Sequence, residues 1–144
     1  MNSTSILEKK IHPLKQALAI CILVFIFLSL AKVMQTEESS TTVFWEIGAS
    51  GLLFYAMMNS VLSIAYENQN QYWLFSIIGF ASLLAVCGGL SFLYSGTNID
   101  EAGSFRWIFL VFTMGYIILL SIVRTMKKII TIAQREDKRL RGEE

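Results

Sequence analysis

The sequence has few residues of the kinds that build catalytic sites, metal centres or covalent cross-links. Its 144 residues include one proline, two cysteines and one histidine. A single histidine excludes a multi-histidine metal site, and two cysteines exclude a disulfide framework. The chain also has no nucleotide-binding glycine motif, no P-loop and no HExxH motif. These absences argue against an enzyme, so we expect no catalytic residues, no cofactor and no bound metal.

Charge is also scarce, and its distribution defines the fold class. Only 16% of the residues are charged while 54% are hydrophobic, whereas a soluble domain carries about 25% charged residues. The charges lie between and after four apolar segments, at about residues 17–33, 43–66, 72–94 and 105–123. Roughly 20 apolar residues span the hydrocarbon core of a bilayer, where the backbone must form its own hydrogen bonds. The sequence therefore predicts an all-α integral membrane protein, a single domain of four transmembrane helices whose first partner is the lipid bilayer.

The last apolar segment continues without a break into a charged one. Residues 104–140 contain no proline and only one glycine. Residues 124–140 are charged, yet their apolar residues keep helical spacing, which predicts one helix that crosses the membrane and extends into the cytoplasm. The basic residues expected at the membrane surface are Arg124, Lys127 and Lys128. The extension is either a membrane anchor with a solvated tail or a stalk that packs on other chains as a short coiled coil.

The lysines and arginines predict the orientation, because they favour the cytoplasmic side. If the N-terminus is inside, ten of the twelve, Lys9 and Lys10 among them, lie on that side. Both termini are therefore expected in the cytoplasm, in an inner or plasma membrane, with Tyr66, Tyr72 and Trp73 at the inner interface. The basic tail is short and close to the membrane, so we do not expect nucleic-acid binding.

Two charges border the apolar segments on the expected outer side. Glu46 and Arg106 each lie near the start of a segment that enters the membrane from outside. We expect them at similar depth, where they would form an ion pair. Such a pair either marks a gate or is ordinary interfacial placement, with Glu46 at the positive end of its helix and Arg106 reaching to water.

The second apolar segment carries a polar face. Gly48, Gly51, Tyr55, Asn59 and Ser63 recur at spacings of three and four residues, which places them on one side of a helix. An unpaired amide in hydrocarbon is unfavourable, so this face must contact protein or water. Tyr55, Asn59 and Ser63 are accordingly either a helix-packing face with interhelical hydrogen bonds or the lining of a pore.

The third apolar segment has small residues at a spacing of four, namely Ala81, Ala85 and Gly89. Small side chains at this spacing allow two helices to approach closely. The partner is either another helix of the same chain or a neighbouring subunit.

The sequence thus contains several patterns typical of helix packing and no motif typical of catalysis or ligand binding. We expect a small non-enzymatic membrane protein that acts as an oligomer-forming or accessory subunit of a membrane complex, through self-association or another membrane protein. A homo-oligomeric ion channel or pore is the alternative. A carrier of a small lipophilic substrate is a weaker one.

Overall fold

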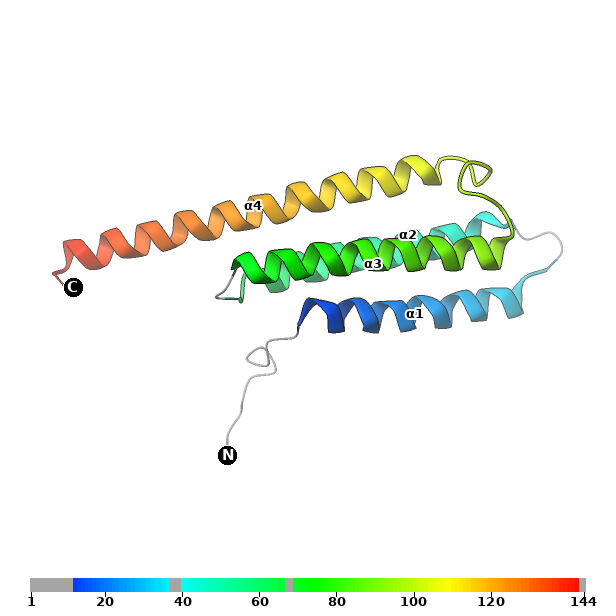
Figure 1. Cartoon of the computed structure of the whole chain (residues 1–144), viewed down its shortest axis with the longest axis horizontal. Coiled ribbons are helices and arrows are strands. Elements are labelled where there is room, and N and C mark those ends of the chain that lie inside the picture. Colours follow the sequence, from blue (N-terminus) through cyan, green and yellow to red (C-terminus); the bar gives the residue numbers. More distant parts are fainter. Residues whose placement is uncertain (1–11, 37–39, 67–68, 143–144) are drawn as a thin grey trace, which may run out of the picture.

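The computed structural model describes residues 12–36, 40–66 and 69–142, and these stretches contain helices and no strand. The four helices are α1 (Pro13–Met34), α2 (Thr42–Ser63), α3 (Gln69–Ser95) and α4 (Phe105–Leu140). They run alternately in opposite directions, so α1 begins and α4 ends at the same end of the bundle (Figure 1). The predicted all-α fold is confirmed, while Lys9 and Lys10 lie outside the described residues.

Three of these helices have the length and apolarity of membrane spans: α1, α3 over Asn70–Ser95, and α4. In their most apolar windows only 22%, 33% and 17% of the residues are buried inside the protein. Most of their apolar side chains therefore face outward. Exposed apolar surface on this scale is typical of a protein surrounded by lipid, which supports a membrane location for the chain.

Helix α2 is not among these three, so three of the four predicted spans coincide with helices long and apolar enough to cross a membrane, and the fourth does not. The physical reason is the position of α2, which packs against each of the other three helices. Eleven of its 22 residues are buried, including Asn59, Ser60 and Ser63. A helix that faces protein on one side has no need of apolar residues there, and its polar residues lower its mean hydropathy.

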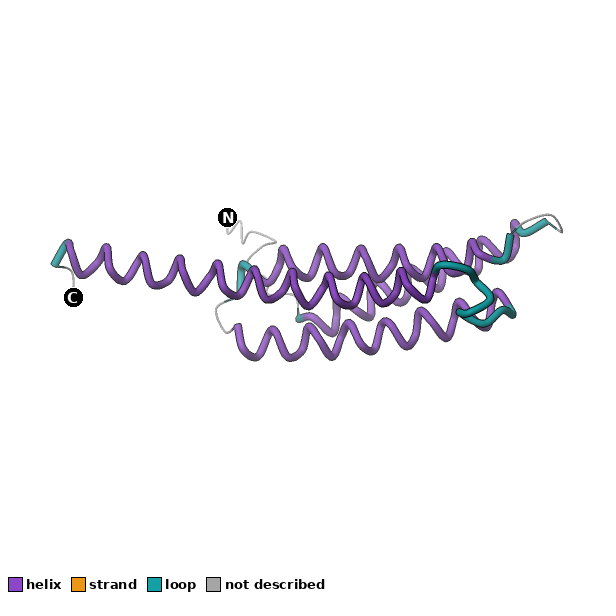
Figure 2. The backbone as a smooth tube through the Cα atoms, turned by 90° about the horizontal axis from the view of Figure 1, so that it is seen from above, coloured by secondary structure: helices purple, strands orange, loops and turns teal. Residues whose placement is uncertain are grey.

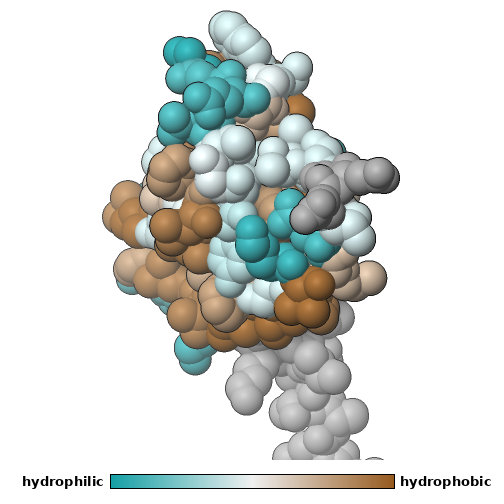
Figure 3. All heavy atoms as spheres, turned by 90° about the vertical axis from the view of Figure 1, so that its right-hand side faces the viewer, coloured by the Kyte–Doolittle hydropathy of each residue, from teal (hydrophilic) through white to brown (hydrophobic). Residues whose placement is uncertain are grey.

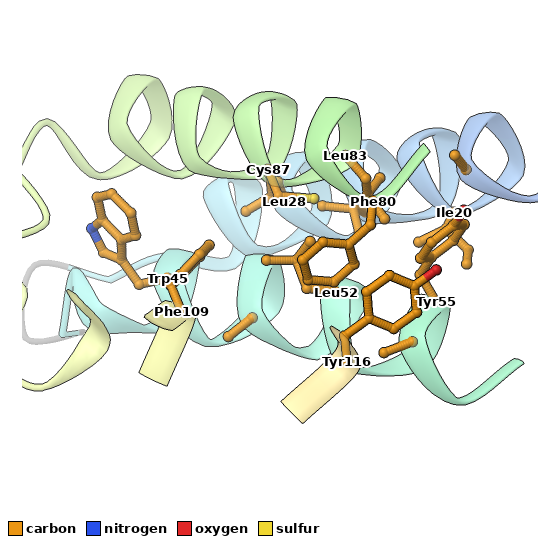
Figure 4. Close-up of a cluster of buried hydrophobic side chains, with 14 of the residues drawn as sticks. Ile20, Leu28, Trp45, Leu52, Tyr55, Phe80, Leu83, Cys87, Phe109 and Tyr116 are labelled. Atoms are coloured by element: carbon orange, nitrogen blue, oxygen red, sulfur yellow. The ribbon is translucent and has the colours of Figure 1, made fainter. Parts of the chain in front are cut away.

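Glycines allow α2 to lie close to its neighbours. A Cβ atom at Gly48 would come within 2.5 Å of Ser91 Oγ on α3, and one at Gly51 would overlap the Val24 side chain on α1. The apolar core among these helices includes Leu52 of α2 and Leu83 of α3 (Figure 4). Helices α1, α2 and α3 therefore form the tightly packed part of the bundle.

Helix α4 has fewer contacts with the rest of the bundle than the other three helices have. It packs on α2, meets α3 at fewer positions and does not approach α1 within the described residues. Only Phe109, Tyr116 and Leu120 of its 36 residues are buried. At 1.5 Å per residue it is about 54 Å long, and it extends well beyond the other helices (Figure 2). We call its last part, residues 124–140, the α4 projection. The predicted single helix over residues 105–140 is confirmed.

The end of the bundle opposite this projection carries the α3–α4 loop. Seen from that end, hydrophilic residues gather at the top of the view and on part of the end surface, while hydrophobic residues lie along its left and lower edges (Figure 3). Gly96 ends α3 with a φ of 68°, a conformation that glycine adopts without steric strain. This polar end and apolar flank are the surface pattern of a bundle that presents one end to water.

Candidate functional site

A group of buried polar side chains links all four helices, and we call it the Asn59 cluster. Asn59 and Tyr55 of α2 are both 0% exposed. The other members are Gln16 of α1, Tyr72 and Ser76 of α3, and Tyr116 of α4, which are also buried. The rings of Tyr55, Phe80 and Tyr116 lie next to one another (Figure 4). No other group of buried polar side chains in the described structure brings the four helices together.

The side chain of Asn59 makes three hydrogen bonds, one to each of the other three helices. Its Nδ2 donates to Gln16 Oε1 at 3.3 Å and to the Tyr72 hydroxyl at 3.1 Å. Its Oδ1 accepts from the Tyr116 hydroxyl at 2.8 Å. The Tyr72 hydroxyl in turn donates to the backbone carbonyl of Asn59 at 3.1 Å. An asparagine amide has two N–H donors and one carbonyl acceptor, so both donors and the acceptor are engaged.

The backbone carbonyl of Ser76 is a second meeting point in the cluster. It lies 3.2 Å from the Tyr55 hydroxyl, which donates to it, and 3.2 Å from the Tyr116 hydroxyl, whose single proton goes to the closer Asn59 Oδ1. The Tyr116 ring also stacks on Phe80, with the ring centroids 4.4 Å apart. Tyr116 therefore attaches α4 to both α2 and α3, through its hydroxyl group and through its ring.

The cluster is enclosed. Tyr55 and Asn59 have no exposed surface, and Ser63 is buried with its hydroxyl donating to the Ser60 carbonyl at 2.7 Å. Each of these side chains points toward other helices of the same chain. A pore lining needs contact with water, and within one chain Tyr55 and Asn59 have none, while Ser63 is only 5% exposed. The geometry is that of an interhelical hydrogen-bonded contact.

Sequence reasoning singled out Tyr55 and Asn59 but missed their partners. Tyr72 was expected at the membrane interface, yet its hydroxyl is buried against Asn59. Gln16 was placed before the first span, whereas α1 begins at Pro13 and carries Gln16 into the bundle. One of these partners could have been found from the sequence. Tyr116 is a tyrosine in the middle of an apolar segment, where its hydroxyl needs a hydrogen-bond partner.

The expected ion pair between Glu46 and Arg106 is wrong. The Arg106 Nη1 atom pairs with Asp100 Oδ1 at 3.0 Å. Glu46 is exposed on the first turns of α2 and joins no ion pair with any other described residue. The reason is the turn of the α3–α4 loop, which brings Asp100 back beside the start of α4. The carboxylate of Asp100 in the loop therefore pairs with Arg106, in place of the expected carboxylate of Glu46 on α2.

The small residues of α3 do not pack on another helix of the same chain. Ala81, Ala85 and Gly89 are exposed on its outer side, and a Cβ atom at Gly89 would meet nothing within 4 Å. The close approach on α3 occurs at Gly79 instead, where a Cβ atom would lie 2.5 Å from the Tyr55 hydroxyl. Of the two partners considered for this face, a neighbouring subunit stays a prediction.

The basic residues expected at the membrane surface lie where α4 leaves the bundle. Arg124 Nη2 donates to Asn70 Oδ1 of α3 at 2.7 Å, and the guanidinium lies over the Trp73 ring, 5.5 Å from its centroid. Lys127 is half-buried and Lys128 is exposed. Arg124 therefore joins the first turns of α3 to the base of the α4 projection.

Comparison of this chain with protein-family models, curated proteins and solved structures finds no match. The function is therefore argued from the residues and their geometry.

Proposed function

We propose that the protein is a non-enzymatic, oligomer-forming subunit of a membrane assembly. In this proposal α2 is the fourth transmembrane helix, and both termini lie on the cytoplasmic side of an inner or plasma membrane. Support for α2 as a span comes from its two faces. Its polar residues face the bundle, while Phe54, Met57 and Val61 are exposed on the outside, where lipid would cover them.

The observation that carries the proposal is an apolar stripe on the α4 projection. Met126, Ile129, Ile130 and Ala133 recur at helical spacing, which places them on one side of α4. Ile129 is 60% exposed and Ile130 is 51% exposed. Beyond the bundle no other described helix is available to cover them (Figure 2). Apolar surface in water is unfavourable by about 25 cal/mol per Å², so this stripe favours a partner.

A second copy of the chain suits the stripe. Met126, Ala133 and Leu140 are spaced seven residues apart, which is the repeat of a coiled-coil seam. In a symmetric pair the same surface contacts itself on both copies, so one stripe suffices. The exposed face of Ala81, Ala85 and Gly89 on α3 offers a further close contact inside the bilayer.

The channel and carrier alternatives gain no specific support from the described structure. The polar residues that would line a path, Tyr55, Asn59 and Ser63, are enclosed within one chain.

Native mass spectrometry of the gently extracted, untagged protein tests the proposal. We expect the unmodified chain to form a homo-oligomer of defined size. The double substitution Ile129→Gln and Ile130→Gln should weaken assembly by about tenfold or more, equivalent to about 1.4 kcal/mol. The matched control is Thr131→Gln, on another side of the same projection, which should assemble normally.

A chain that is monomeric in every condition would contradict the proposal. Stable association only with a different chain would replace it with an accessory role. Equal weakening in the Thr131→Gln control would remove the apolar stripe as the reason for assembly.

A further inference from the structure

A groove separate from the Asn59 cluster lies between the α4 projection and the first turns of α3. Its volume is about 500 Å³. The polar residues that line it are Asn70, Arg124, Lys127, Lys128, Thr131 and Arg135. Four of these six side chains are basic, and none of the described lining residues is acidic. The groove is therefore suited to an anion.

One basic side chain of the groove, that of Arg124, has contacts within the protein that orient it in the absence of a ligand. Arg124 is fixed by its hydrogen bond to Asn70 and by the Trp73 ring beneath it. A guanidinium has five N–H donors, so several stay available after the one to Asn70. Arginine binds the paired oxygens of a phosphate with two parallel hydrogen bonds. A fixed side chain also loses little conformational entropy on binding, which favours affinity.

The position of the groove indicates the source of the anion. Arg124 follows directly on the apolar part of α4, and Trp73 lies at the same level. Tryptophan and arginine at the end of an apolar span are typical of the headgroup region of a bilayer. The groove is also lined by the apolar Ile132, and Leu74, one helical turn beyond Asn70 on α3, is exposed. A ligand here would have its phosphate among cations and its hydrocarbon beside apolar side chains.

We propose that the groove between α3 and α4 binds the phosphate of an anionic phospholipid headgroup. Arg124 is the fixed contact, and Lys128 and Arg135 of the projection complete the charge on the groove wall. Basic pockets between membrane helices bind anionic headgroups by this charge complementarity. The site is independent of the apolar stripe, which lies on another side of α4.

The test uses the full chain in nanodiscs of phosphatidylcholine with a minor fraction of phosphatidylglycerol. Native mass spectrometry then measures which lipid each protein retains. The unmodified chain should retain phosphatidylglycerol in preference to phosphatidylcholine. The variant Lys128→Gln with Arg135→Gln removes two groove cations without touching Arg124, and it should lower that preference by about tenfold or more.

The matched control is Lys138→Gln with Arg139→Gln, which removes the same charge from the same helix beyond the groove. It should keep the full preference. Equal loss in both variants would overturn the proposal, because attraction would then depend on total charge. Absence of any preference in the unmodified chain would also overturn it.

A further arm separates a lipid headgroup from a free phosphate. Inorganic phosphate is added to the unmodified chain before lipid retention is measured. Unchanged retention supports a headgroup site, whereas displacement at low phosphate concentration would identify a free phosphate as the ligand and overturn the lipid assignment. The oligomeric state, read from the same spectra, should be unchanged in the groove variant, so this result does not depend on the proposed function.

Discussion

Asn59 is the residue at which hydrogen bonds from all four helices meet. Its side chain contacts Gln16 of α1, Tyr72 of α3 and Tyr116 of α4. Each of these partners is buried, so loss of the amide removes one buried hydrogen bond to each of the other three helices. Asn59 therefore contributes to the attachment of all four helices at once.

The substitution Asn59→Leu should destabilise the bundle by about 2–4 kcal/mol, because it removes three buried hydrogen bonds, each of which stabilises by about 0.5–1.5 kcal/mol. The measurement is the unfolding midpoint in mixed micelles with increasing SDS. Ser50→Leu is the control, since Ser50 is exposed on α2 and bonds only its own helix, to the Glu46 carbonyl. Equal stability of the Asn59→Leu variant and the unmodified chain would contradict this view of the cluster.

At the residue scale, sequence reasoning located the polar face but not its partners. The spacing of Tyr55, Asn59 and Ser63 is local information, and it correctly indicated that Asn59 lies on a helix face that contacts protein. The identity of that partner depends on how helices rotate and slide against each other. Gln16 and Tyr116 reach Asn59 across 43 and 57 residues of sequence, a relation that no local pattern contains.

At the element scale, the contrast is between glycines that lie in a contact and glycines that do not. Gly51 of α2 faces the Val24 side chain on α1, while Gly115 of α4 has open space around it. Both are helical, so the same substitution tests their surroundings with the helix itself held constant.

Gly51→Ala should destabilise the bundle by about 1–3 kcal/mol, because the added methyl group overlaps the stiff, β-branched Val24 and forces α1 and α2 apart. Gly115→Ala should be neutral or stabilising by up to about 1 kcal/mol, since alanine is the better helix former. Thermal and SDS unfolding of the two variants measure both effects. If both variants were destabilised to a similar extent, the close contact of Gly51 with α1 would not be the cause.

The four helices themselves were accessible from sequence because length and hydropathy are properties of each segment alone. The way the third one packs was not. A spacing of four indicated Ala81, Ala85 and Gly89 as the contact face, while the close contact inside the chain is made by Gly79. Small residues fit equally well against lipid, a subunit or a neighbouring helix, so their spacing does not choose between them.

At the scale of the whole molecule, the four helices bring the start of α1 and the end of α4 to one end of the bundle (Figure 1). The basic groove and the projection lie at that same end. The α3–α4 loop, with Asp100 and Glu101, lies at the other. Topology in the membrane therefore determines which compartment the projection meets.

Cysteine labelling in cells tests that topology. In a chain with Cys21 and Cys87 replaced by alanine, Gln134→Cys should react with a membrane-impermeant maleimide only after the cells are opened. Asn98→Cys, in the α3–α4 loop, should react with intact cells, because basic residues favour the cytoplasmic side. The parent without an introduced cysteine is the control for background labelling. The reverse pattern would show that the projection lies outside.

The light attachment of α4 has a mechanical consequence. Its buried residues end at Leu120, and beyond them Arg124 still contacts Asn70 and Trp73 of α3. From Arg124 to Leu140 the helix runs about 24 Å, so a tilt of about 10° around this contact moves the far end by about 4 Å. A small change of angle at the edge of the bundle thus becomes a displacement of several ångströms at the tip of the helix.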